Sequence, residues 1–119
     1  MSTKNYKTCP VAATLELIGG KYKAIILWHL MEKTLRYNEI HKKIPYATDK
    51  MLTQQLRELE KDGFINRTVY PVVPPKTEYS LTDFGKTLSP ILYEMRNWGN
   101  MYLEITGSTS DCPATCTES

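Results

Sequence analysis

The sequence contains no long hydrophobic run. Among its 119 residues, no apolar stretch approaches the roughly 20 residues that a membrane-spanning helix needs. The first residues, MSTKNYKTCPVAA, lack the apolar centre of a signal peptide. We therefore expect a cytoplasmic protein without a membrane partner.

The motifs of common enzymes are also missing. There is no glycine-rich phosphate loop, no serine elbow, no paired carboxylates in a plausible cleft and no C-x2-C redox motif. We therefore expect no catalytic activity, and no motif calls for a cofactor.

Cysteine is scarce, with Cys9, Cys112 and Cys116 as the only three in the sequence. This number is odd and too small for a disulfide scaffold, so packing, metal binding or redox sensing are the uses to consider. Three thiols lack a fourth ligand for a thiophilic metal, because His29 falls inside a predicted core helix and His41 falls elsewhere. No metal site is expected.

The net charge is only +2, but positive charge gathers in the middle of the chain. From Lys33 to Lys76 there are nine basic residues and five acidic ones. Such an asymmetry attracts a polyanion to one face of a protein. A middle region that is merely solvated explains the same count equally well.

The stretch TDKMLTQQLRELEKDGFINRTVY, residues 48–70, organises the rest of the chain. Thr48 suits a helix N-cap, and Gly63 suits the left-handed turn that ends a helix. Between them, one face is a stripe of leucines: Leu52, Leu56 and Leu59. Another face carries groups that contact base edges and phosphates in a DNA major groove: Asp49, Lys50, Thr53, Gln54 and Arg57. A solvated surface helix has a similar pattern.

Three helical segments are predicted before this stretch. Residues 11–18 form a short helix, and residues 21–33 form a helix that is apolar around most of its circumference and so occupies the core. Residues 34–43 fit a brief extended piece followed by a third helix. Only residues 45–47 separate it from the helix after Thr48, which is the spacing of a helix-turn-helix or of a plain helical hairpin.

A β-hairpin is predicted after Gly63. The run FINRTVY alternates as a half-buried strand does, three prolines restrict the following turn, and KTEYSL forms the second strand. A helix-turn-helix followed by a hairpin is a winged helix.

The last predicted helix, residues 90–105, has a broader apolar face than one edge of a small domain needs. Packing on the first helix uses part of this face, and self-association explains the rest. We expect a flexible N-terminus over residues 1–8, a folded domain over residues 9–106 and a flexible tail over residues 107–119.

Five segments of the chain resemble the HxlR-type winged helix-turn-helix regulators, relatives of the MarR group. They are CPV at residues 9–11, IGGKYK at 18–23, LTQQLRELEKDGFINR at 52–67, VPPKTEYSLTDFG at 73–85 and WG at 98–99. The resemblance implies an α+β fold that is mostly α, with a two-stranded hairpin wing and terminal dimerisation helices. It also implies a homodimer that regulates transcription by binding a palindromic operator in double-stranded DNA.

The resemblance implies that the helix after Thr48 enters the major groove and that the wing lies beside the minor groove. By their chemistry, Gln54 and Thr53 suit base reading, whereas Lys50 and Arg57 suit phosphates or a guanine. The whole predicted DNA-binding set is Lys42, Lys43, Thr48, Lys50, Thr53, Gln54, Arg57, Arg67 and Lys76. The rival interpretation is a winged helix that binds only proteins, although such a module more often shows an apolar patch at this place.

A dimer is expected because a symmetric operator needs two recognition helices about 34 Å apart, and one subunit supplies one. The predicted interface is Leu15, Leu92, Met95, Trp98, Met101 and Tyr102.

Cys9 immediately precedes a predicted helix N-terminus, where the helix dipole favours a thiolate. In some members of the HxlR-type family the cysteine of the CPV motif senses oxidants or electrophiles, and other members with this motif have no known inducer. Cys9 is therefore a redox-sensing candidate, with packing at the dimer interface as the alternative. Cys112 and Cys116 either pair with Cys9 of a second subunit or have no role.

Overall fold

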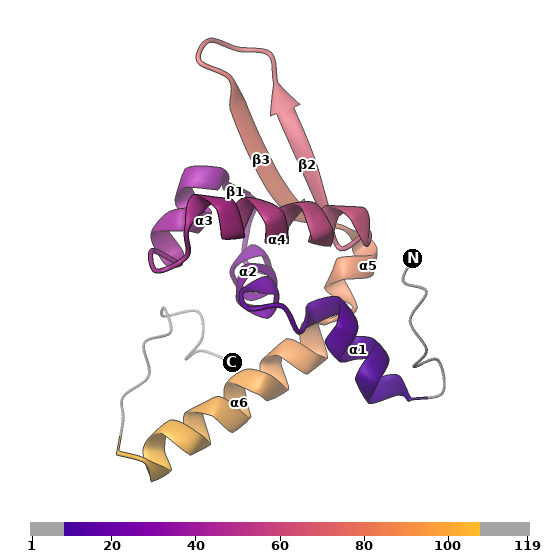
Figure 1. The fold of residues 1–119 in the computed structure, drawn as a ribbon, viewed down its shortest axis with the longest axis vertical. Coiled ribbons are helices and arrows are strands. Elements are labelled where there is room, and N and C mark those ends of the chain that lie inside the picture. The colour runs from indigo at the N-terminus through magenta and orange to yellow at the C-terminus, as the bar shows by residue number, and fades with distance from the viewer. Residues whose placement is uncertain (1–8, 108–119) are drawn as a thin grey trace.

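The computed structural model describes residues 9–107 as a helical body from which a β-hairpin projects (Figure 1). In chain order the elements are α1 (Pro10–Ile18), α2 (Lys23–Leu30), β1 (Leu35–Arg36), α3 (Tyr37–Lys43), α4 (Asp49–Lys61), β2 (Ile65–Tyr70), β3 (Lys76–Leu81), α5 (Asp83–Lys86) and α6 (Ser89–Ile105). This mixture of helices and an antiparallel sheet confirms the predicted winged helix-turn-helix fold.

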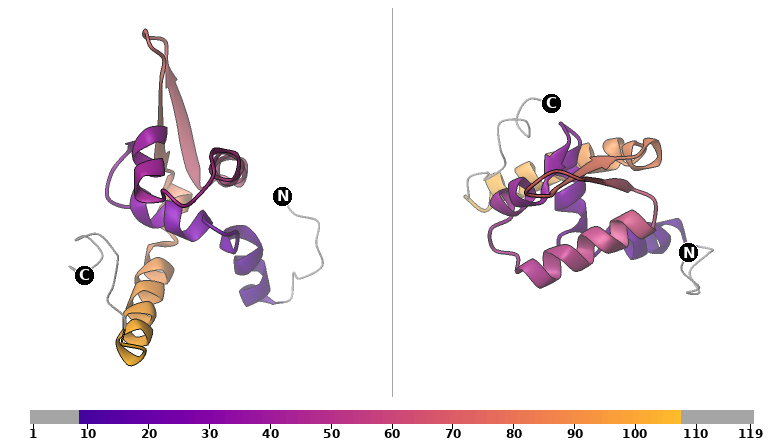
Figure 2. Two further views of the ribbon diagram at one scale, coloured as in Figure 1. Left: turned by 60° about the vertical axis from the view of Figure 1, so that its left-hand side comes forward. Right: turned by 90° about the horizontal axis from the view of Figure 1, so that it is seen from above.

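Helix α2 lies at the centre of the core, as its apolar circumference predicts. Its Ile26 and Leu27 are completely buried, and the helix contacts α3, α4, α6 and β3. The leucine stripe of α4 is also buried against this core. Figure 2 shows α4 end-on in its left view, with one side against the body and the other side open.

The two ends of α4 have the caps that the sequence predicts. The Thr48 hydroxyl accepts a hydrogen bond of 3.1 Å from the backbone N–H of Met51. Gly63 follows the helix with a φ of 86°, a conformation that residues with a Cβ avoid. The loop between α3 and α4 is short, so the two helices form the helix-turn-helix.

The sheet has three strands in the order β1-β3-β2, whereas the sequence predicted two. β1 comprises only two residues, and Leu35 pairs with Tyr79 of β3. The predicted half-buried character of β2 is also wrong, because only Ile65 of that strand is buried. The hairpin extends past the core, so alternate residues have nothing to pack against (Figure 1).

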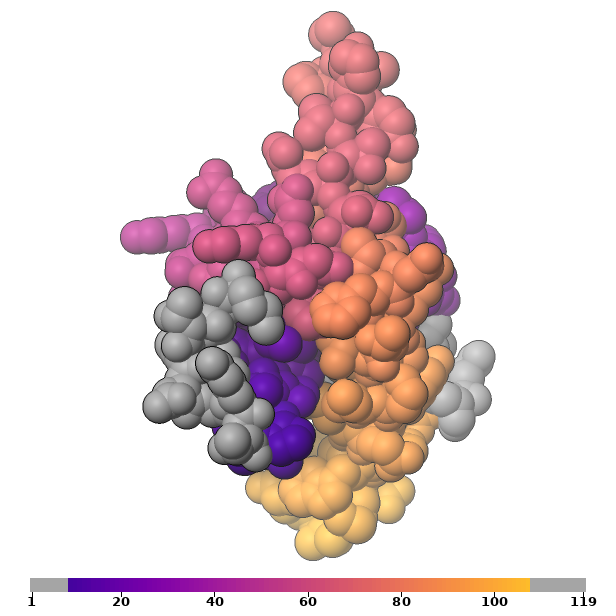
Figure 3. Space-filling view, turned by 90° about the vertical axis from the view of Figure 1, so that its right-hand side faces the viewer, coloured from indigo at the N-terminus to yellow at the C-terminus, as the bar shows by residue number. Residues whose placement is uncertain are grey.

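Helix α6 begins at Ser89 and Pro90, where the sequence predicts a new helix, and it runs for 17 residues. Leu92 is its one buried residue, at 3% exposure in the core of its own subunit. Leu92 is therefore not available to a partner, and we remove it from the predicted dimer interface. Figure 3 shows α6 leading away from the base of the hairpin, with α1 beside its first part. In residues 9–107, no helix is long and apolar enough to cross a membrane.

Candidate nucleic-acid interface

The outer side of α4 presents a row of polar side chains. Lys50, Gln54 and Arg57 are all exposed, and their spacing of four and three residues places them along one face of the helix. The opposite face is fixed in the core by the leucine stripe. The row therefore stands on a helix that cannot rotate without exposing its leucines.

Gln54 is not a free surface amide. Its Nε2 donates to Glu58 Oε2 at 3.2 Å, and Glu58 Oε1 lies 2.6 Å from Lys23 Nζ of α2. The side chain of Lys23 is only 8% exposed. The hydrogen bond from Lys23 is the largest influence on the pKa of Glu58, which is lowered, so this carboxylate stays ionised.

A second polar anchor holds α4 from below. Gln55 is buried, and its Oε1 accepts a 3.0 Å hydrogen bond from the backbone N–H of Tyr22. Gly20 leaves room for this amide, because a Cβ there would lie 2.8 Å from Gln55 Oε1. The segment IGGKYK therefore packs against the inner side of α4 and holds the helix in place. Sequence reasoning missed this role, and the only local signals were a glutamine and a lysine within otherwise apolar patterns.

The first turn of α4 is tied to α3. Tyr37 donates from its hydroxyl to Asp49 Oδ1 at 2.6 Å, and His41 Nδ1 lies 3.1 Å from the same oxygen. The other ring nitrogen of His41 is 2.9 Å from the Ala47 carbonyl oxygen. The pKa of Tyr37 is raised, first by burial and then by the bond to Asp49, while a hydrogen bond with Thr53 opposes the rise. The Asp49 carboxylate and the Thr53 hydroxyl thus stabilise the helix-turn-helix itself.

The two basic residues of the wing lie on opposite faces of the hairpin. Arg67 is exposed and pairs with Tyr79, so it shares a face with the core side of the sheet. Lys76 is on the other face, 4.8 Å from the ring centroid of Tyr70 and 3.7 Å from Glu78 Oε2. Its charge is therefore partly engaged within the wing.

The remaining basic candidates belong to α3. Lys42 and Lys43 are both exposed at its C-terminal end. Lys43 is also near enough to His29 to affect it: the pKa of His29 falls to about 4, mainly because of burial and then because of Lys43. Lys43 thus borders α2, while Arg57 and Lys50 lie on the outer side of α4. Thr48 is occupied by its capping bond.

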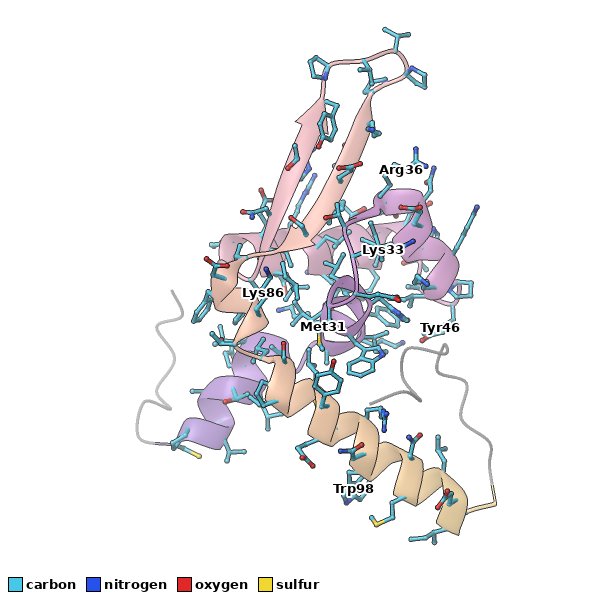
Figure 4. All side chains as sticks on the ribbon, turned by 180° about the vertical axis from the view of Figure 1, so that it is seen from behind. Met31, Lys33, Arg36, Tyr46, Lys86 and Trp98 are labelled. Atoms are coloured by element: carbon cyan, nitrogen blue, oxygen red, sulfur yellow. The ribbon has the colours of Figure 1, made fainter. Side chains whose placement is uncertain are left out.

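A second surface consists of exposed apolar side chains on α1 and α6. We call it the α1–α6 apolar face, and its members are Val11, Leu15, Ile91, Met95, Trp98, Met101, Tyr102 and Ile105. Trp98 is 62% exposed, and its ring stacks on that of Tyr102 with 5.6 Å between centroids. In Figure 4, Trp98 projects from α6 away from the body. Five of the six predicted interface residues belong to this face, together with three residues that the predicted interface did not include: Val11, Ile91 and Ile105.

Cys9 is the N-cap of α1. It is exposed, and its Sγ accepts a 3.5 Å hydrogen bond from the backbone N–H of Ala12. Cys112 and Cys116 lie outside the residues that the structure describes. Within residues 9–107, no three His, Cys, Asp or Glu side chains are grouped so as to hold a metal ion.

Comparison with known proteins places this geometry in a family context. The family model for HxlR-like helix-turn-helix proteins matches residues 17–106. The HTH-type transcriptional regulator YdeP of Bacillus subtilis (strain 168) is 54% identical over 101 residues, which make up 85% of this chain and 79% of YdeP.

Solved structures give the same result. The redox regulator HypR in its oxidised form has a TM-score of 0.75 and 53% identity, covering 78% of this chain and 96% of HypR. The reduced form of the transcriptional regulator YodB from B. subtilis has a TM-score of 0.68 and 34% identity, covering 81% of this chain and 95% of YodB. All three relatives are named as regulators, in agreement with the expectation of a protein that is not an enzyme.

Proposed function

The chain belongs to the HxlR-like helix-turn-helix family of transcriptional regulators, and from this premise we propose that it acts as a homodimer on a palindromic operator. Each subunit lays α4 in the major groove of one half-site and its wing beside the minor groove. The observation that carries the proposal is the exposed row of Lys50, Gln54 and Arg57 on a helix whose other side is locked in the core. We propose that it acts in the cytoplasm, where a bacterium such as the one that carries YdeP keeps its DNA.

The contacts divide by chemistry. Gln54 reads a base edge and Thr53 offers its methyl group to a thymine, while Lys50 and Arg57 meet phosphates or a guanine. Phosphate contacts, which position the protein without reading sequence, come from the α3 and wing cations: Lys42, Lys43, Arg67 and Lys76. Of these, Arg67 is exposed, whereas Lys76 must leave Tyr70 or share its charge.

The α1–α6 apolar face supplies the dimer contact. Eight large apolar side chains exposed on two neighbouring helices exceed what a monomer ordinarily leaves in water. A twofold axis near α6 would join two subunits by this face and leave both α4 helices free, because α6 leads away from the wing (Figure 1).

We propose further that Cys9 couples the regulator to oxidants or electrophiles. HypR is described as a redox regulator, and this chain resembles it over most of its length. The exposed Cys9 thiol caps the helix that carries Val11 and Leu15, both members of the α1–α6 apolar face. Modification of the thiol would therefore act where the subunits meet.

Selection from a library of random duplex DNA tests the function. The purified protein is used with reductant and again after mild diamide oxidation, alongside Cys9→Ser. We expect one palindrome to be selected in reductant, to be lost on oxidation, and to be retained by Cys9→Ser under both conditions. A palindrome that is indifferent to oxidation would refute the thiol switch alone.

The rival function is a winged helix that binds only protein partners. DNA binding by the α4 row must weaken steeply with salt, because each phosphate contact releases counterions. If the protein selects no DNA sequence and binds a protein partner with an affinity that salt does not weaken, the rival function is favoured.

A further inference from the structure

We propose that Glu58, held by the buried Lys23, is a positioning residue that fixes the amide of Gln54 to read adenine. This inference rests on the proposed function, since it concerns how α4 reads its half-site. It assigns a role to two residues that do not themselves need to touch DNA.

The carboxylate of Glu58 bridges the core and the DNA-facing row. One of its oxygens lies 2.6 Å from Lys23 Nζ, and the other accepts from Gln54 Nε2 at 3.2 Å. Lys23 belongs to α2 and is almost completely buried, so it cannot follow the movements of a surface side chain. The position of the Gln54 amide is thereby fixed relative to the core of the domain.

This arrangement leaves a defined pattern on Gln54. A glutamine amide has two N–H donors and one carbonyl acceptor, and Glu58 uses one donor. In the proposed arrangement Glu58 takes the N–H that points away from the carbonyl, so the other N–H and the carbonyl oxygen lie side by side. In the major groove, adenine presents an acceptor at N7 beside a donor at N6, whereas guanine presents two acceptors. The fixed amide therefore matches adenine and mismatches guanine.

Lys23 also solves a charge problem. Glu58 is 41% exposed and lies on the helix that must approach phosphates, where an unpaired carboxylate would repel DNA. The lysine ammonium neutralises it from the inner side. The same contact lowers the pKa of Glu58, so the acceptor for Gln54 is present throughout the neutral pH range.

The test compares two double variants, Lys23→Met with Glu58→Gln, and Lys23→Met with Glu58→Ala. Removing both charges avoids the buried unpaired ion that a single Lys23 or Glu58 substitution would create. The two variants then differ only in whether position 58 keeps an acceptor for Gln54. The matched control is Glu60→Ala, which removes an exposed acid from the same helix.

The readout is base preference at the operator position that Gln54→Ala relaxes. We measure the ratio of Kd values for adenine and for the other bases there, and the effect of 7-deazaadenine, which lacks N7. Loss of the ordering of one side chain predicts that the Glu58→Ala double variant loses about fivefold in this ratio and becomes insensitive to 7-deazaadenine. The Glu58→Gln double variant keeps the acceptor but not its anchor at Lys23, so it loses less than the Glu58→Ala double variant, and Glu60→Ala keeps both properties. Binding to unrelated DNA is unchanged in the two double variants, because each removes one positive and one negative charge.

An unchanged ratio in the Glu58→Ala double variant, at a position that Gln54→Ala does relax, would overturn this inference while leaving the proposed function intact. A wild-type protein that selects no sequence would instead remove the proposed function and the inference with it. If the double variants do not fold, Glu58→Gln and Glu58→Ala are compared with Lys23 in place, and the same results support or overturn the proposal.

Discussion

Helices α4 and α6 are both amphipathic, but only the apolar face of α4 is buried within its own subunit. α4 has 13 residues and buries four of them, Leu52, Gln55, Leu56 and Leu59. α6 has 17 residues and buries only Leu92. The apolar side chains of α4 are thus covered by the rest of its own chain, whereas most of those on α6 are exposed to water.

The two helices also use polar groups differently. α4 is tied to its neighbours through Asp49, Gln55 and Glu58, each bonded to a residue outside the helix. α6 instead stacks Trp98 on its own Tyr102 and meets α2 through the contact of Trp28 with Tyr93. A helix that reads DNA needs a fixed orientation, whereas a helix that meets a second subunit needs an exposed apolar side.

The largest effect is expected when a buried side chain on the inner face of α4 is removed. Leu56→Ala should lower the free energy of unfolding by about 2–5 kcal/mol, because it leaves a cavity at a fully buried position. Gln54→Ala on the outer side of the same helix should change the free energy of unfolding by less than about 0.5 kcal/mol. Urea denaturation of both variants at one protein concentration measures the difference, and equal losses would contradict a one-sided anchor.

The matching test on α6 is Trp98→Glu. A charge at the exposed centre of the α1–α6 apolar face should split the dimer, and the affinity for a palindromic operator should fall about a hundredfold as the linked second half-site is lost. Sedimentation equilibrium and operator titration measure the two effects. Lys86→Glu, on the exposed part of α5, is the control and should remain dimeric. A Trp98→Glu variant that is still dimeric would place the interface elsewhere.

A smaller effect distinguishes reading from positioning on the DNA side. Gln54→Ala should cost about 1–3 kcal/mol of discrimination at one operator position. Arg67→Ala, on the exposed wing, should weaken binding to all sequences alike and lower the salt slope by about 1. Titrations of matched and mismatched duplexes at several salt concentrations separate the two, and identical profiles would refute the division of roles.

The smallest effect concerns α2, which packs against both helices. The pKa of His29 is lowered from 6.5 to about 4 by burial and by Lys43. The unfolded chain therefore binds a proton below about pH 6.5 while the folded chain does not, and stability falls as the pH drops from 6.5 towards 4. His29→Gln should lose part of this dependence. Melting temperatures at pH 7 and pH 5 provide the check, and parallel shifts in both proteins would exclude His29.

Local signals predicted α4 well. Thr48, Gly63 and the leucine stripe act within one helix, so their effects can be read from spacing alone, and the structure bears out all three. The same holds for the start of α6, which begins at Ser89 and Pro90, next to the predicted first residue of the last helix.

Contacts between distant segments escaped prediction. The brief extended piece before α3 was predicted and corresponds to β1, but its pairing with β3, some forty residues later, was not. The bonds of Tyr22 to Gln55 and of Lys23 to Glu58 join α4 to a segment more than thirty residues before it. Leu92 was assigned to the wrong surface because helical spacing gives a face but does not say whether the core or a partner covers it.

The order of strands in the sheet connects the wing mechanically to the helix-turn-helix. β3 pairs with β2 over its full length and with β1 at Glu78 and Tyr79, near its middle, and β1 runs directly into α3 without an intervening residue. The first turn of α3 is stiffened where the two meet, since the Arg36 backbone N–H donates to Glu39 Oε1 at 2.8 Å. A force on the wing tip, such as that from contact with a DNA backbone, would therefore be transmitted through β1 to the helix-turn-helix.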